Sequence, residues 1–203
     1  MLVFDECTSG FRETNGGIFK KYGVEPDMAV FGKTIANGYA LTAVVGKREV
    51  MEAAQSTFIS STFWTERIGP AAALKTLEVF EKEKPWDYIT EVGIYVKEQW
   101  LNIAKNNNLR IDTFGIPALA GFSFISNDAL KYKTLITQEL LKKGYLASTV
   151  LYSCTAHTKP VINSYLEELD TVFQKIEKCE RGTLNIDDLL EGPVCHGGFK
   201  RLN

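Results

Sequence analysis

Two charged residues each follow a short apolar segment, and their side chains together could perform imine chemistry. Residues 2–4 are followed by Asp5, and residues 28–31 are followed by Gly32 and Lys33. In a wound α/β sheet, side chains just beyond the strands project from the edge where ligands bind. A lysine amine can condense with a carbonyl carbon, and a neighbouring carboxylate can keep a bound heterocyclic nitrogen protonated. Asp5 and Lys33 are therefore the first candidate site.

Other interpretations of the same residues are open when only residue types are considered. An aspartate at the end of a strand often serves as a turn or cap residue, and most lysines are simply solvated. Gly32-Lys33-Thr34 also matches the end of a nucleotide-binding P-loop. That motif requires a glycine five residues before its Gly-Lys pair, where this sequence has Asp27. The nucleotide interpretation therefore fails on spacing.

A hydroxyl-rich segment, residues 60–67, precedes a helix expected to begin near Pro70. Hydroxyl groups and free main-chain donors at a helix N-terminus can bind phosphate. Capping of the helix by a serine or threonine explains the same residues equally well. His157 and His196 are isolated in the sequence, and we interpret His157 as a structural residue rather than a general base.

The pattern of apolar residues predicts an α/β protein. Three short apolar runs without alternation indicate a parallel or mixed sheet that is covered on both faces. From residue 109 onward, strand and helix patterns follow one another in a compact α/β arrangement. The expected strands are 2–4, 28–31, 41–45, one at Phe114, 118–125 and 145–152, and the expected helices are 47–55, 70–83, 86–107, 129–143 and 161–181.

We divide the chain into a partial large domain of residues 1–84, a small α/β domain of residues 85–182, and an arm of residues 183–203. The division at residue 84 follows a change in character next to Pro85, which should stop the preceding helix. The arm contains paired Gly-Pro and Gly-Gly residues and is expected to pack loosely.

The composition of the chain indicates which kinds of binding partner to expect. The net charge of -2 provides no basic field for nucleic acid or an anionic membrane, so a small polar or anionic substrate is expected. We expect no signal peptide and no membrane span, because no apolar run approaches about 20 residues. On these grounds we expect a cytoplasmic location. The four cysteines form no CxxC pair, which predicts free thiols, as expected in a reducing compartment, and no metal site.

Three segments of the sequence resemble a known family in order and spacing: LVFDECTSGFRETNGG, PDMAVFGKTIANGYALTAVVGKREVM and STFWTERIGPAAALKTLE. They are similar to the second half of class III aminotransferases, closest to the glutamate-1-semialdehyde 2,1-aminomutase-like members. The resemblance is strong over residues 1 to about 84. It implies the C-terminal part of the large domain of a fold-type I pyridoxal-phosphate enzyme, with a mainly parallel sheet and helices, followed by a small α/β C-terminal domain.

The resemblance also implies roles for three residues. Lys33 matches the lysine that forms a Schiff base with pyridoxal 5'-phosphate, and Asp5 matches the aspartate that pairs with the pyridine nitrogen. Thr65, five residues before Pro70, matches the threonine that binds the cofactor phosphate of the neighbouring subunit. The implied activity is amino-group transfer between small molecules, by an aminotransferase or a 1,2-aminomutase. In this mechanism the freed lysine moves the proton between substrate and cofactor carbons.

The chain departs from the family in length, because the family's chain is about twice as long. The first half of the family supplies the phosphate loop, the aromatic residue stacked on the ring and much of the substrate pocket. We therefore expect a truncated or split-gene product with little activity alone, completed by a homodimer or by a complementing N-terminal half. The alternative is a non-catalytic interaction or assembly module, or an inactive remnant.

Overall fold

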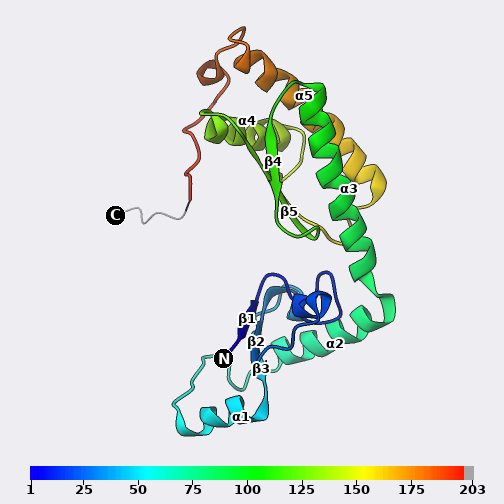
Figure 1. Ribbon diagram of the computed structural model, residues 1–203, viewed down its shortest axis with the longest axis vertical. Coiled ribbons are helices and arrows are strands. Elements are labelled where there is room, and N and C mark those ends of the chain that lie inside the picture. The colour runs from blue at the N-terminus through cyan, green and yellow to red at the C-terminus, as the bar shows by residue number, and fades with distance from the viewer. Residues whose placement is uncertain (199–203) are drawn as a thin grey trace. The chain divides into compact units, whose positions relative to one another are not determined.

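The computed structural model describes residues 1–198 and divides the chain into two compact units. Unit 1 is Met1–Thr90, and unit 2 begins at Glu91 and includes the C-terminal residues. Each unit contains its own three-stranded sheet (Figure 1). The arrangement confirms the predicted α/β class.

Unit 1 is built on a mixed sheet of β1 (Val3–Glu6), β2 (Met28–Phe31) and β3 (Ala43–Gly46). β1 and β2 are parallel, whereas β2 and β3 are antiparallel. Of the two expected sheet types, parallel and mixed, the sheet is therefore mixed. The carboxylate of Asp27 joins the strand ends by accepting hydrogen bonds from the Leu2 N–H and the Lys47 amine, at 2.7 and 3.0 Å. These bonds, chiefly the one from Leu2, lower the pKa of Asp27.

The two faces of this sheet are more exposed at β3 than the sequence predicted. Val44 and Val45 of β3 remain about half exposed, although the absence of alternation predicted burial on both faces. The expectation is wrong for β3, because no element within the described residues of unit 1 covers these side chains. The buried part of unit 1 is correspondingly small. Its hydrophobic cluster contains five buried residues: Ala29, Phe31, Ile35, Ala36 and Ala73.

The helices of unit 1 lie close to their predicted positions. The helix expected over 47–55 is α1 (Arg48–Met51) followed by a 3-10 helix (Glu52–Ser56). α2 (Ile68–Glu83) begins two residues before Pro70 and ends before Pro85, as predicted. Lys84 adopts a left-handed conformation and donates its N–H to the Phe80 carbonyl, which terminates α2.

Helix α3 (Pro85–Asn106) follows at once, since proline is well tolerated at a first helical position. It crosses the boundary between the two units and carries apolar residues at helical spacing, including Val96 and Trp100, which are fully buried in unit 2. Gly93 lies where a side chain could not, because a Cβ atom there would come within 1.8 Å of the Pro117 carbonyl oxygen.

Unit 2 contains an antiparallel sheet with the order β4 (Ile111–Phe114), β5 (Leu119–Phe124) and β6 (Val150–Tyr152). β6 is shorter than the strand expected over 145–152. In place of a strand, Tyr145 and Ala147 pack against the hydrophobic core from an irregular segment.

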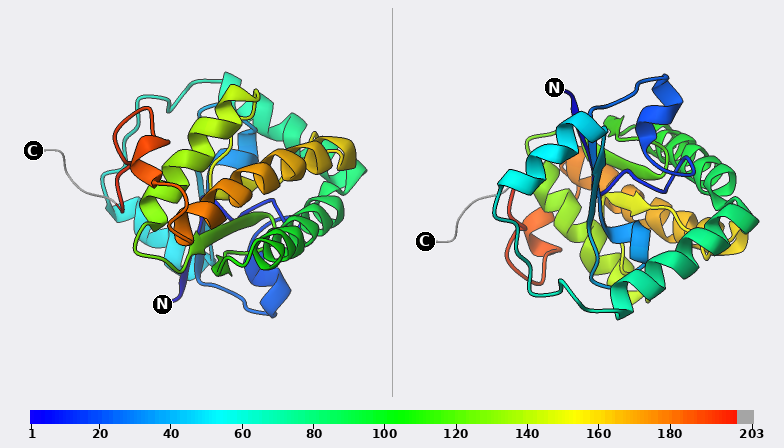
Figure 2. Two further views of the ribbon diagram at one scale, coloured as in Figure 1. Left: turned by 90° about the horizontal axis from the view of Figure 1, so that it is seen from above. Right: turned by 90° about the horizontal axis from the view of Figure 1, so that it is seen from below.

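Three helices cover one face of this sheet. Besides α3, these are α4 (Ala129–Lys142) and α5 (Lys159–Glu180), which lie side by side (Figure 2). Phe122 of β5 contacts Trp100 of α3 and Phe173 of α5, while Phe124 contacts Tyr132 of α4 and Phe173. Because Phe122 and Phe124 are two residues apart, they face the same side of the strand.

The segment after α5 packs more closely than its glycines suggested. A short 3-10 helix (Ile186–Asp188) buries Ile186 in the core of unit 2. The Glu191 N–H donates to the side chain of Gln138, and the Cys195 N–H donates to the Thr134 hydroxyl. The expectation of a loose arm is therefore wrong up to Cys195, because this segment supplies apolar and hydrogen-bonding partners to α4.

Residues 199–203 of the expected arm lie outside the described residues. The two compact units meet between residues 90 and 91. The predicted domain boundary at residue 84 lies six residues earlier and stays a prediction. Within the part of the chain that the structure describes, no helix is both long and apolar enough to cross a membrane.

Candidate active site

Asp5 and Lys33 are brought to one edge of the sheet in unit 1. β1 and β2 run in the same direction, with Glu6 opposite Phe31, so the two strands end together. Asp5 is the last residue but one of β1, and Lys33 lies two residues beyond the end of β2. Both side chains are exposed, which leaves them accessible to a ligand above the strand ends.

Lys33 begins a short 3-10 helix (Lys33–Ala36) in an uncommon backbone conformation. Its φ of 46° lies in the left-handed region, where a residue with a Cβ atom is strained. Its amine donates a hydrogen bond of 2.6 Å to the hydroxyl of Thr8. Gly32 allows the close approach of the two segments, because a Cβ there would lie 3.1 Å from the sulfur of Cys7.

The two acidic residues at the end of β1 have different environments. Asp5 is exposed and accepts a hydrogen bond of 3.1 Å from the Cys7 N–H. Glu6 is fully buried, and its carboxylate accepts hydrogen bonds from the Ser9 hydroxyl and the Phe19 N–H. Because side chains alternate along a strand, only Asp5 is available to a ligand, while Glu6 fixes the loop that follows.

Glu6 and Thr8 are site residues whose roles sequence reasoning missed. The alternation of faces along β1 could have separated Glu6 from Asp5. No local signal pointed to Thr8, because its contact with Lys33 joins positions 25 residues apart.

The N-terminus of α2 is capped differently from either sequence interpretation. Both carboxylate oxygens of Glu66 accept main-chain hydrogen bonds, from Ile68 and Gly69. A glutamate therefore replaces the expected serine or threonine cap. The same two donors are not available to a phosphate group, which contradicts the view of this helix end as a set of free donors.

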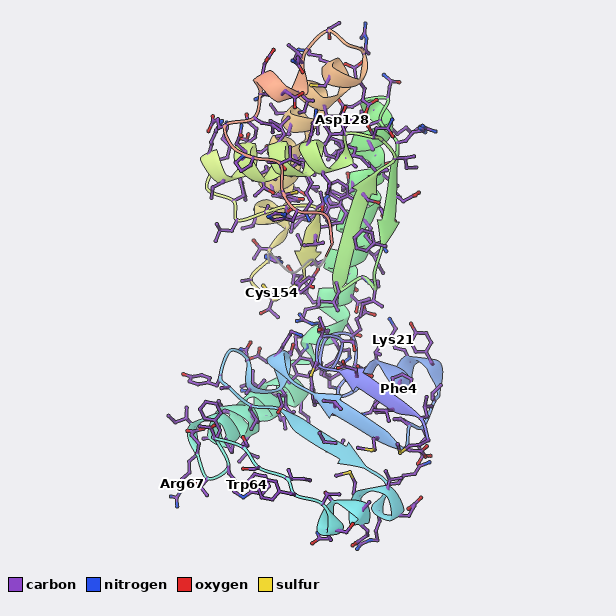
Figure 3. All side chains as sticks on the ribbon, turned by 90° about the vertical axis from the view of Figure 1, so that its left-hand side faces the viewer. Phe4, Lys21, Trp64, Arg67, Asp128 and Cys154 are labelled. Atoms are coloured by element: carbon purple, nitrogen blue, oxygen red, sulfur yellow. The ribbon has the colours of Figure 1, made fainter. Side chains whose placement is uncertain are left out.

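Thr65 lies in the exposed loop just before this cap. The side chain of Arg67, two residues further along, projects outward from the loop (Figure 3). The structure places Thr65 on the surface of unit 1 and does not bring it among the residues that line the hollow described next. Its role stays a prediction.

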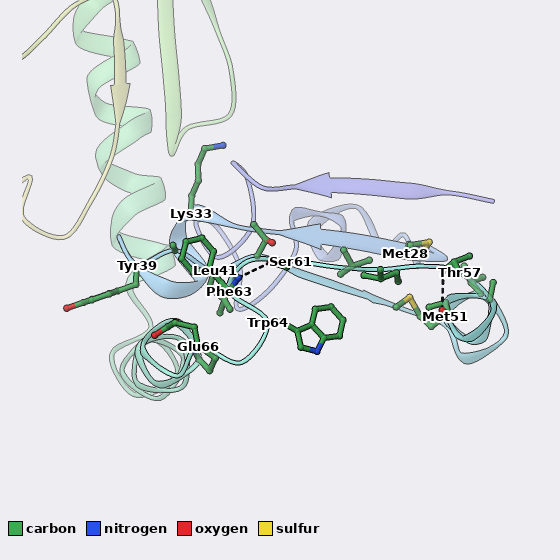
Figure 4. A pocket seen from close by; sticks show the side chains of 18 of the residues that line it. Met28, Lys33, Tyr39, Leu41, Met51, Thr57, Ser61, Phe63, Trp64 and Glu66 are labelled. Carbon is green, nitrogen blue, oxygen red and sulfur yellow. Dashed lines mark hydrogen bonds between the residues drawn. The ribbon is translucent and has the colours of Figure 1, made fainter.

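A hollow of about 1250 Å³ lies on unit 1 between the sheet and the segment that precedes α2. Lys33 is at one end of the hollow, and Met51 and Thr57 are near the other (Figure 4). Phe63 and Trp64 contribute aromatic side chains to its wall. The amine of Lys33 points away from these two rings, so the hollow extends beside the lysine rather than around its reactive atom.

Among the described residues of unit 2, we find no comparable cluster of reactive groups. His157 accepts a hydrogen bond from the Cys154 N–H on its Nδ1 atom, and burial lowers its pKa. A neutral imidazole that accepts a main-chain hydrogen bond fits the structural role expected for His157. All four cysteines are free thiols, and the described residues contain no group of three or more potential metal ligands.

Solved structures with a similar fold identify the architecture of this chain. The FumI protein of Sphingopyxis sp. MTA144, solved in a form carrying pyridoxal phosphate, superposes with a TM-score of 0.80 at 23% identity, over 93% of this chain and 46% of that one. An S-selective transaminase from Bacillus megaterium gives a TM-score of 0.74 at 18% identity, over 89% and 45% of the two chains. The fold is thus that of a C-terminal portion of a pyridoxal-phosphate-dependent transferase.

The family model described as Aminotransferase class-III matches residues 1–179, and the chain belongs to this family. The 3-aminobutyryl-CoA aminotransferase of Cloacimonas acidaminovorans is 32% identical over 88% of this chain and 44% of its own length. A glutamate-1-semialdehyde 2,1-aminomutase of Methanosphaera stadtmanae is 25% identical over 88% and 46%. The chain therefore spans about half the length of these relatives.

Family membership confirms pyridoxal phosphate as the cofactor expected from the sequence. The residues at the strand ends fit two parts of this molecule. Lys33 presents an accessible amine for its aldehyde group, and Asp5 presents an accessible carboxylate for its ring nitrogen. The phosphate group fits less well, because Glu66 occupies the first donors of α2.

Proposed function

We propose that this chain supplies Lys33 as the Schiff-base lysine of a pyridoxal-phosphate-dependent amino-group transfer. The observation that carries the proposal is the meeting of Lys33 and Asp5 at the ends of two parallel strands. Bound pyridoxal phosphate would supply an electron sink for the electrons of a bond broken at the substrate carbon.

The residues of the chain have distinct parts in this reaction. Lys33 holds the cofactor covalently, and when its amine is released the Nζ atom takes and returns the proton of the substrate carbon. Asp5 keeps a proton on the ring nitrogen through its carboxylate, whose other contact is the Cys7 N–H. The substrates are a small amino donor and acceptor. Transamination and 1,2-amino transfer use the same lysine and both fall within the proposal.

The proposal includes a partner for unit 1. Thr65 binds the phosphate of a neighbouring subunit, so the functional assembly is a homodimer or a complex with a complementing N-terminal half. Two observations support a partner: the half-exposed Val44 and Val45 of β3, and the exposed rings of Phe63 and Trp64 beside the hollow. Apolar groups of this kind are typical of surfaces covered in an assembly. The cytoplasmic location expected from the sequence is part of the same proposal.

Trapping of the cofactor tests the proposal directly. The purified chain is incubated with pyridoxal phosphate, its visible absorbance is recorded, and the complex is reduced with borohydride and mapped by peptide analysis. We expect an absorbance band and label on Lys33, both absent in Lys33→Ala and both retained in a matched surface variant, Lys82→Ala. Label spread equally over surface lysines in all three proteins would refute the assignment of Lys33.

A second experiment tests the partner. An N-terminal half taken from a class III relative is added as a separate chain, and amino transfer is measured with and without it, together with the molecular mass in solution. We expect activity to rise on addition of the half. A chain that stays monomeric, binds no added half and gains no activity would contradict the split-enzyme assembly.

A further inference from the structure

We propose that Thr8 is a positioning residue that holds the amine of Lys33 at the ends of β1 and β2 before the cofactor binds. The inference rests on the proposed function and adds a residue to that site. It starts from one contact, the 2.6 Å hydrogen bond from Lys33 Nζ to Thr8 Oγ1. A lysine side chain carries about 2 kcal/mol of rotamer entropy, so an exposed lysine explores many positions unless something restrains it.

The turn that carries Thr8 is itself well fixed. The Gly10 N–H donates to the Glu6 carbonyl, and the Arg12 side chain donates to the Thr8 carbonyl. The buried Glu6 side chain holds Ser9, the next residue along the chain. The hydroxyl of Thr8 is therefore presented by a turn restrained from both sides, which makes it a suitable anchor for a flexible amine.

The same turn places the carboxylate of Asp5. Its side chain accepts the Cys7 N–H at the start of the turn, one residue before Thr8. Lys33 has a left-handed φ of 46° where the chain leaves β2, a conformation that is strained for a residue with a Cβ atom. Together these features keep Lys33 and Asp5 in a fixed relation, with Thr8 as the link between them.

A hydroxyl suits this task better than a carboxylate. An ionised carboxylate accepts hydrogen bonds from the amine in either form, but its negative charge favours the charged ammonium, which does not react with an aldehyde. A threonine hydroxyl can accept from a charged amine and donate to a neutral one. Thr8 can thus retain Lys33 in the form that reacts with an aldehyde, and release it when the covalent bond forms.

The first test uses the chain without cofactor. Carbon relaxation at Lys33 Cε is measured by NMR in the wild-type chain, in Thr8→Val and in Thr8→Ser, with the exposed Lys82 of α2 as a reference for a mobile lysine. We expect Lys33 to be restrained in the wild type and in Thr8→Ser, and as mobile as Lys82 in Thr8→Val. A Lys33 that is equally mobile in the wild type and in Thr8→Val would overturn the inference.

The second test measures the consequence for labelling. After incubation with pyridoxal phosphate and borohydride, the ratio of label on Lys33 to label on Lys82 should fall about five-fold in Thr8→Val, the effect of losing one hydrogen bond. The ratio should stay within about two-fold in Thr8→Ser. Thr76→Val is the matched control, because it removes a hydroxyl that bonds only the Ala72 carbonyl in α2.

Thr8→Ala is a second variant in case the valine disturbs the turn, and hydrogen exchange of unit 1 checks that each variant is folded. An unchanged labelling ratio in folded Thr8→Val and Thr8→Ala would refute the positioning role. If Lys33 is restrained by Thr8 in the NMR experiment while even the wild-type chain traps no cofactor at Lys33, the positioning inference holds and the proposed function fails.

Discussion

The two units of this chain differ in how much of their apolar surface they bury. Unit 2 holds a cluster of 21 buried hydrophobic residues contributed by three helices, the sheet and the segment after α5. Unit 1 holds a cluster of five, while Phe58 is 94% and Trp64 66% exposed. Because apolar burial is the main source of folding free energy, unit 2 is the stable part of the chain.

The candidate site residues all belong to the unit with the smaller hydrophobic cluster. Lys33, Asp5 and Thr65 lie in unit 1, and Lys33 adopts a strained backbone conformation there. Stability and chemistry are therefore separated along the chain. The exposed apolar groups of unit 1 support the proposed partner, which would cover them.

The largest expected effect concerns the core of unit 2. Phe173→Ala removes a fully buried ring that contacts both Phe122 and Phe124, and should lower the free energy of unfolding by about 3–5 kcal/mol. Phe58→Ala, which truncates an exposed ring in unit 1, should change it by less than about 0.5 kcal/mol. Hydrogen exchange of each unit measures both. Equal losses in the two variants would break the contrast between the units.

Gly93→Ala should also destabilise unit 2, by about 2–3 kcal/mol. Alanine normally stabilises a helix relative to glycine, but here its Cβ would overlap the Pro117 carbonyl. The backbone oxygen cannot move away without displacing the start of β5. Asn102→Ala, at an exposed position of α3, is the control and should be neutral or slightly stabilising in denaturant unfolding. A stabilising Gly93→Ala would show that α3 does not approach Pro117 closely.

A charged network should make unit 2 sensitive to acid. Burial raises the pKa of Glu139, but hydrogen bonds from Lys142, Lys175 and Gln138 outweigh it and lower the pKa to about 2. A carboxylate with a lowered folded pKa stabilises the protein above its unfolded pKa, and this contribution is lost as pH falls from about 5 to about 2.

Glu139→Gln should therefore cost about 1–2 kcal/mol at pH 7, less than the full shift represents because solvent screens the lysines. The variant should also lose part of the acid dependence seen in urea unfolding between pH 5 and pH 2. Glu78→Gln, which breaks the exposed pair with Lys75 in unit 1, should cost less than about 0.5 kcal/mol. An unchanged pH profile in Glu139→Gln would exclude this network as a stabilising feature.

The smallest expected effect concerns the strained backbone of Lys33 in unit 1. Lys33→Gly should stabilise unit 1 by about 1 kcal/mol relative to Lys33→Ala, because glycine adopts a φ of 46° without a steric penalty. Both variants should lose the label at position 33. Hydrogen exchange of β1 and β2 compares them, and equal protection would mean that position 33 is unstrained.

Much of the fold followed from local patterns in the sequence. The helical spacing of Val96 and Trp100 and the proline at position 85 predicted α2 and α3 within a few residues of their observed bounds. The strand expected over 145–152 was predicted too long, because Tyr145 and Ala147 are apolar for packing rather than for pairing. The packed segment around Ile186 was missed, since glycines nearby indicated a loop but not what the loop contacts.

The sequence by itself determined the family, the cofactor and the identity of the candidate residues Lys33, Asp5 and Thr65, because motif order and spacing are properties of the chain alone. The tertiary structure decided which groups meet. Only the parallel pairing of β1 and β2 sets Asp5 and Lys33 at one edge, and only the turn after β1 brings Thr8 to the lysine amine. Contacts between residues 25 positions apart depend on chain topology, which no local pattern encodes.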